Sequence, residues 1–103
     1  MDRIEKLKQF LETNPHDPFV MHALALEYVK SGEEGMAKEL FVSILDRDPL
    51  YTGTYYHLAK LFERTGQTEE ARKIYTQGIE ACRNTGDNHA LRELQNAYED
   101  FMY

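Results

Sequence analysis

The chain has 103 residues, of which 42% are hydrophobic and 29% charged, and its formal net charge is −6 at pH 7. This length is typical of one domain with a modest core, and the acidic balance disfavours binding to nucleic-acid phosphates or anionic membranes. No apolar run approaches the roughly 20 residues that span a bilayer, and the charged N-terminus lacks the apolar core of a signal peptide. We therefore expect a cytoplasmic protein, and its single cysteine, Cys82, fits a reducing compartment.

The first predicted helix covers residues 2–14. Pro15 ends it, because the residue before a proline is disfavoured in the helical conformation. Its apolar residues recur at helical spacing and form the expected packing face: Ile4, Leu7, Phe10 and Leu11.

Residues 17–49 predict two helices joined by a turn. Asp17 is the expected N-cap of the first helix, with Pro18 in its first position, and Gly32 is the expected left-handed residue that closes it. The second helix ends before Pro49. Both helices carry an apolar stripe at helical spacing: Met21, Leu24, Ala25, Tyr28, Met36, Ala37, Leu40, Phe41, Ile44 and Leu45.

Residues 51–84 repeat this plan. A helix is expected over residues 52–65, with Gly66 closing it, and Thr68 is expected to cap a second helix that ends near Thr85 and Gly86. The stripe of the preceding segment returns 34 positions later as Tyr55, Leu58, Ala59, Phe62, Gly66, Ala71 and Tyr75.

The last predicted helix covers residues 87–103. Here a shift of 36 residues, in place of 34, sets Leu91, Leu94 and Tyr98 in register with Tyr55, Leu58 and Phe62. We attribute the two extra residues to a longer preceding helix. Gln95 replaces the small alanine of the earlier helices, so no further helix is expected to pack closely there, and the helix should act as a solubility cap.

This 34-residue pattern of small, leucine and aromatic positions resembles the tetratricopeptide repeat (TPR) family, in its small bacterial form. The resemblance implies an all-α single domain of about six helices, in which antiparallel hairpins stack as a short right-handed superhelix. Residues 2–14 would be a packing half-repeat, 17–49 and 51–84 two repeats, and 87–103 a C-terminal capping helix. Gly78 and Arg83 depart from the family, which prefers alanine and proline there.

In TPR folds the first helix of each pair lines a concave groove that takes a peptide or a helix of another protein. The resemblance therefore implies a non-catalytic interaction module without a cofactor. Phe19, Leu26 and Val29 lie off the predicted packing stripe, so either they contact a partner or the N-terminal helix covers them, and both alternatives stay open. By position, the groove would be lined by Phe19, His22, Leu26, Val29, Tyr56, His57, Lys60, Arg64, His89 and Arg92.

Some family members grip the C-terminal carboxylate of heat-shock chaperones with a set of lysines, asparagines and an arginine. We expect no adaptor of that kind, since those residues are missing here. The basic residues of the groove still favour a carboxylate-bearing peptide of another sort. The clamp positions hold His22, Leu26, His57, His89 and Glu93.

Other kinds of function have weaker signals in the sequence. The histidines form no recognisable metal-binding box, and the chain has neither a glycine-rich phosphate loop nor a pattern that pairs a nucleophile with a base. Homodimerisation is an alternative, because Tyr51, Tyr56, Phe101 and Tyr103 lie outside the repeat core. RNA binding by helical repeats is a further alternative that the net charge disfavours.

Overall fold

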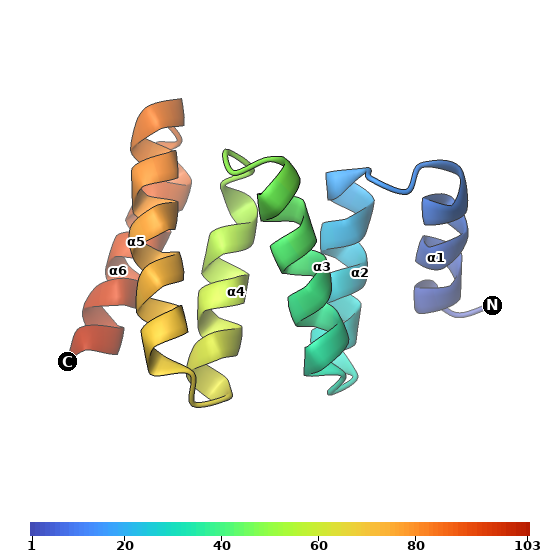
Figure 1. Ribbon diagram of the computed structural model, residues 1–103, viewed down its shortest axis with the longest axis horizontal. Helices are drawn as coiled ribbons and strands as arrows, with labels where there is room; N and C mark the ends of the chain where they lie inside the picture. The colour runs from blue at the N-terminus through green and yellow to red at the C-terminus, as the bar shows by residue number, and fades with distance from the viewer. The chain divides into compact units, whose positions relative to one another are not determined.

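The structure, a computed structural model, describes residues 1–103 and contains six α-helices and no strands. The chain forms two compact units, residues 1–48 with three helices and residues 49–103 with the other three. Within each unit, consecutive helices run antiparallel (Figure 1). The expected all-α fold of six helices is confirmed. In chain order the helices are α1 (Arg3–Thr13), α2 (Pro18–Lys30), α3 (Glu34–Arg47), α4 (Gly53–Arg64), α5 (Thr68–Thr85) and α6 (Asn88–Met102).

Short-range signals in the sequence located the helix ends well. The Asp17 carboxylate accepts hydrogen bonds from the N–H groups of Phe19 at 3.0 Å and Val20 at 3.3 Å, which confirms it as the N-cap of α2. Left-handed glycines close the first helix of each pair and the long α5, because only glycine adopts this conformation without steric cost. Their φ angles are 81° at Gly32, 77° at Gly66 and 73° at Gly86.

The predicted start of α5 is wrong in detail. Gln67 occupies the cap position and makes no side-chain capping bond, whereas Thr68 is already the first helical residue. Acidic side chains in the first turn, Glu69 and Glu70, favour this end of the helix through their interaction with the helix dipole.

The first unit is built on α2, which contacts both α1 and α3. Ala25 on α2 and Ala37 on α3 are fully buried, as expected for the positions where two helices approach most closely. Two expected packing residues are exposed instead. Met36 lies on the outer side of α3, and Phe10 of α1 is 62% exposed. Phe10 fails to pack because α2 covers the side of α1 that carries Leu7, while Phe10 lies on the flank of that contact.

In the second unit each helix contacts both of the others. The helix α5 has 18 residues where α3 has 14, which confirms the lengthening inferred from the broken period. Leu94 is fully buried, and Gln95 is exposed, as the shifted register predicts. Leu91 and Tyr98, in the same register, are half-buried.

Gly78 lies where the three helices of the second unit meet. A Cβ atom at this position would be 2.6 Å from the Cβ of Tyr55 on α4 and 3.0 Å from Cδ1 of Leu94 on α6. A methyl group therefore does not fit, which accounts for the departure from the alanine that the family prefers.

Aromatic rings join the C-terminal half of α6 to α5. The ring of Tyr75 lies 5.5 Å from the rings of both Tyr98 and Phe101, and the Arg72 guanidinium lies 5.9 Å from the centre of the Phe101 ring. Phe101 is therefore part of the internal packing. This differs from the expectation from the sequence, which placed Phe101 outside the repeat core. Tyr103, in contrast, is fully exposed.

Candidate functional site

The predicted groove residues of the second unit lie on a polar face of α4 and α6. On α4, Tyr56, His57, Lys60 and Arg64 are spaced at helical intervals, so their side chains share one side of the helix. This side adjoins α6, because His57 and Glu93 of α6 interact electrostatically. We call this surface the α4/α6 face. His89 and Arg92 of α6 are exposed near Glu93 at helical spacing.

His57 is a neutral hydrogen-bonding group on this face. Burial lowers the pKa of its imidazole below the ordinary value of 6.5; Glu93 opposes that shift and Arg64 adds to it. The ring of Tyr56 stands edge-on to the His57 ring at 5.3 Å. At pH 7 the imidazole therefore offers one donor and one acceptor, and the positive charge of the face comes from its lysine and arginines.

Glu63, the acid that contacts Lys60 on α4, is partly engaged inside the unit. The hydroxyl of Tyr75 donates to the Glu63 carboxylate, and Lys60 Nζ lies 3.6 Å from Glu63 Oε2. Burial, followed by the bond to Glu63, raises the pKa of Tyr75 well above its usual range, so the hydroxyl stays protonated. Lys60 has hydrogen-bonding capacity left for a ligand, since an ammonium group has three donors.

The remaining predicted groove residues lie on α2 in the first unit. Phe19 is 73% exposed, while Leu26 and Val29 are half-buried. The ring of His22 lies 5.6 Å from that of Phe41, so part of this side chain serves the contact between α2 and α3.

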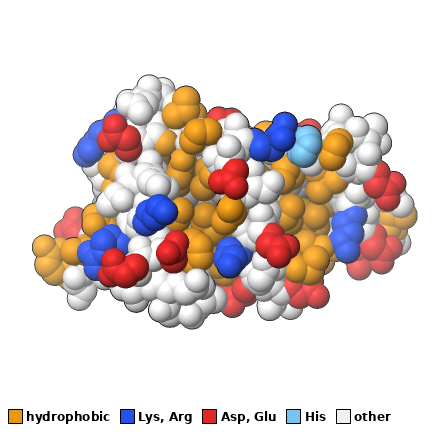
Figure 2. Space-filling model, in the orientation of Figure 1, with side chains coloured by type: hydrophobic (Ala, Val, Ile, Leu, Met, Phe, Trp, Pro, Cys, Tyr) orange, Lys and Arg blue, Asp and Glu red, His pale blue; other side chains and the backbone are white.

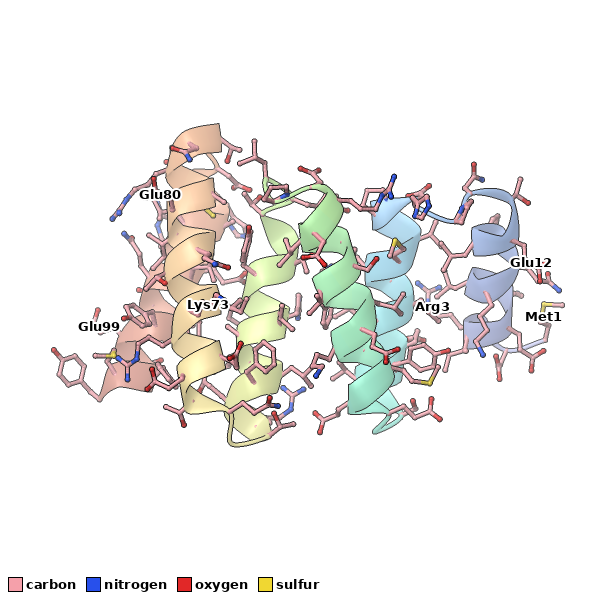
Figure 3. The ribbon with its side chains drawn as sticks, viewed as in Figure 1. Met1, Arg3, Glu12, Lys73, Glu80 and Glu99 are labelled. Carbon is pink, nitrogen blue, oxygen red and sulfur yellow. The ribbon has the colours of Figure 1, made fainter.

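The helix α1 covers a different part of α2. Arg3 Nε lies 3.4 Å from Glu27 Oε1, in the space between the two helices (Figure 3), and Lys8 Nζ lies 5.9 Å from the centre of the Tyr28 ring. Phe19 therefore stays exposed beside this contact.

The sequence did not predict a hollow of about 900 Å³ that is lined by α5, α6 and the C-terminal Tyr103. The exposed polar residue Gln95 was the one signal for it, since it occupies a position at which the earlier helices carry a buried alanine. Figure 2 shows hydrophobic surface beside charged side chains of both signs at the C-terminal end of α6.

The geometry limits the chemistry of these surfaces. No three histidine, cysteine, aspartate or glutamate side chains lie close enough to hold a metal ion. No helix is long and apolar enough to cross a membrane. The surfaces described above offer aromatic contacts and charged hydrogen-bond donors, which are the means of recognising another chain.

Comparison with known proteins supports the family assignment. Residues 52–85 match the sequence model of the tetratricopeptide repeat. A TPR domain protein from Salinibacter ruber is 44% identical, with a TM-score of 0.80, and the match covers 84% of this chain and 96% of that one. The mouse interferon-induced protein with tetratricopeptide repeats 3 is 28% identical over 88% of this chain, but the chain spans only 22% of that protein's length.

A more distant structure contains a bound ligand. The first TPR of Spaghetti (RPAP3) in complex with the HSP90 peptide SRMEEVD has a TM-score of 0.71 at 20% identity, covering 93% of this chain and 77% of that one. At this identity the likeness concerns the fold alone. The fold, the repeat match and the identity to the Salinibacter ruber protein together show that this chain belongs to the tetratricopeptide repeat family.

Proposed function

We propose that this protein is a non-catalytic, cytoplasmic interaction module that binds a peptide or a helix of another protein on the first-helix faces of its repeats. The observation that carries the proposal is the α4/α6 face, where the half-buried His57 lies 5.3 Å from the Tyr56 ring and within the influence of the Arg64 and Glu93 charges, with Lys60 one helical turn away. Membership of the TPR family supports it, because interaction with other proteins is the general function of this fold.

The α4/α6 face suits a ligand that carries a carboxylate. Lys60, Arg64 and Arg92 can donate charge-assisted hydrogen bonds, which are shorter and stronger than neutral ones. Tyr56 supplies apolar contact area from a side chain that is already half-buried, so little conformational entropy is lost on binding. A short acidic or C-terminal peptide combines both needs.

The exposed side of α2 suits an apolar side chain of the ligand. Phe19 is largely exposed, and Leu26 and Val29 keep part of their surface accessible. A few buried anchor side chains dominate the affinity of most interfaces, and the exposed Phe19 is the aromatic candidate on this helix.

The chaperone tail itself is not the expected ligand. Spaghetti (RPAP3) binds the HSP90 peptide SRMEEVD, but three histidines, a leucine and a glutamate stand here where the resemblance would place the clamp. Glu93 in particular repels the carboxylates of such a peptide. Calorimetry with SRMEEVD should therefore show no tight binding, and a dissociation constant below about 1 μM would contradict this part of the proposal.

Charge reversal on α4 tests the proposed site. Proteins that co-purify with the tagged chain from its native cells provide candidate ligands, which are then synthesised as peptides and titrated against the purified protein. The Lys60→Glu/Arg64→Glu variant should bind at least about tenfold more weakly, with unchanged helicity in circular dichroism.

The matched control is Lys38→Glu/Lys73→Glu, which makes the same change in charge at exposed positions of α3 and α5. It should bind as the unaltered protein does. Equal affinity of both variants would show that the α4/α6 face is not the site. Affinity for RNA that falls steeply with salt would favour the RNA alternative.

A further inference from the structure

The hollow between α5 and α6 is a surface outside the proposed peptide site. Its floor is apolar, with Ile79 of α5 and Tyr98 and Met102 of α6. Its rim is acidic: Glu80 of α5 and Glu99 of α6 both point to the outer side of the unit (Figure 3). Arg83 is the one base among its lining residues.

The register of the repeats shows what kind of element fits there. In α2 and α4 the faces that carry Ala25 and Ala59 are fully buried, and each of these helices packs against the second helix of its pair. In α6 the matching residue is Gln95, which is exposed and lines the hollow. The hollow is therefore the place at which the second helix of a pair would pack on α6.

The chain carries a helix of that kind in α1. Leu7 and Phe10 lie one period of 34 residues before Phe41 and Ile44 of α3. Leu7 is buried against α2, but Phe10 is 62% exposed whereas Ile44 is 1% exposed. Since Phe10 lies one turn from Lys6, α1 presents an edge with one large apolar side chain and one positive charge.

We propose that α1 of a second copy of this chain docks in the hollow between α5 and α6. Phe10 packs on the floor formed by Ile79, Tyr98 and Met102, and Lys6 lies at the acidic rim that carries Glu80 and Glu99. The two surfaces are complementary in apolar character and in charge. They are also different from each other, so that one copy donates α1 to the next in a head-to-tail contact. This contact leaves the α4/α6 face unused and is independent of the proposed peptide site.

The association is weak and sensitive to salt. Gln95 stands where alanine would let two helices approach closely, so the docked helix stays farther from α6 than α3 does from α2. Charge pairs at an exposed rim contribute little individually and are screened at high ionic strength.

A charge exchange tests the proposal with two variants of the whole 103-residue protein. Lys6→Glu places an acid on α1, and Glu80→Lys/Glu99→Lys places bases on the rim of the hollow. Sedimentation velocity over a concentration series at low salt should show association for the unaltered protein and weaker association for each variant alone. The mixture of the two variants should associate more strongly again, because each α1 then meets a hollow of opposite charge.

Every outcome decides the question. Monomers of the unaltered protein up to about 1 mM, or association of either variant alone as strong as that of the unaltered protein, would overturn the proposal. A mixture that associates no more strongly than the variants alone would do the same. Lys38→Glu is the matched control for Lys6→Glu, since it makes the same charge change on α3 and should leave the association unchanged.

Two single substitutions test the apolar part of the contact. Phe10→Ser should raise the dissociation constant at least about tenfold while leaving the folding transition nearly unchanged, because Phe10 is mostly exposed in the single chain. Gln95→Ala should lower the dissociation constant, since the helices can then approach more closely. No effect of Phe10→Ser would show that α1 does not enter the hollow.

Discussion

The two repeats pack equivalent positions with side chains of very different size. In the first unit, Met21 of α2 and Ile44 of α3 are both buried and of similar volume. One period later these positions hold Tyr55, a large aromatic residue, and Gly78, the smallest residue. The Tyr55 hydroxyl donates to the Pro49 carbonyl at 2.5 Å, so the polar end of this large side chain is satisfied. The large side chain of Tyr55 thus occupies the space that a side chain at position 78 would need.

The terminal helices of the two units differ in the same instructive way. The helix α6 contacts both α4 and α5 and buries Ala90, Leu94 and Ala97. The helix α1 packs on α2 and buries only Leu7. A helix that contacts two neighbours buries more apolar surface, and is therefore stabilised more, than a helix that contacts one.

The largest expected effect on stability comes from adding a methyl group at Gly78. Gly78→Ala should lower the free energy of unfolding by about 1–3 kcal/mol, even though alanine favours helices by about 1 kcal/mol. The reason is that the added Cβ meets the Cβ of Tyr55 at 2.6 Å, and this atom cannot rotate away. Urea denaturation followed by circular dichroism measures the loss.

Gly35→Ala is the matched control in the first unit. Gly35 lies in α3, and a Cβ there would meet nothing within 4 Å. The same substitution should therefore raise the stability by about 0.4–1 kcal/mol. If both variants shift the unfolding midpoint in the same direction, the close contact at Gly78 does not decide the residue type.

An intermediate effect is expected at Asp87, which links the starts of α4 and α6. Its carboxylate caps α6 by accepting from the Ala90 N–H at 3.1 Å, and it also accepts from the Thr52 hydroxyl at 2.5 Å. In the first unit, the carboxylate of Asp17 makes its capping bonds to α2 and to no second helix. Asp87→Ala should cost about 1–2 kcal/mol, and Thr52→Val, which removes one of the two bonds, should cost less. An equal cost for both variants would contradict the double role.

The same contact has a pH dependence of known sign. Two hydrogen bonds lower the pKa of Asp87 below its ordinary 3.8; the bond from the Thr52 hydroxyl has the larger effect and the bond from the Ala90 N–H the smaller. A lowered pKa means that the folded state favours the ionised form, so the contribution is present at neutral pH and is lost as the pH falls below 3.8. The Asp87→Ala variant should lose less stability than the unaltered protein over that range.

The smallest expected effect is at Tyr75, whose counterpart one period earlier is Phe41. Tyr75→Phe gives both units the same residue at this position and removes the hydroxyl that donates to Glu63. We expect the free energy of unfolding to fall by about 1 kcal/mol, because Glu63 keeps its contact with Lys60.

The bond also has a pH dependence. Burial raises the pKa of Tyr75, so its neutral form stabilises the fold below pH 10 and that contribution fades as the pH rises further. Thermal unfolding near pH 7 and above pH 10 should show both differences; a variant as stable as the unaltered protein at pH 7 would contradict the bond's contribution.

The sequence by itself determined the helices, most of their ends and the repeat. These depend on residues within about four positions of each other, as with Asp17 capping α2 or the left-handed Gly32, and on a period of 34 residues that is visible without the structure. The placement of His57, Lys60 and Arg64 on one face of α4 follows from the same periodicity.

The tertiary structure alone decided how those helices are used. It determined that Phe10 is exposed, that Phe101 packs on Tyr75, that Gly78 admits no methyl group and that a hollow opens beside Gln95. Each of these outcomes depends on the distance between atoms of different helices, and a fraction of an ångström there separates a good contact from a clash. The linear pattern contains the identities of these residues but not those distances.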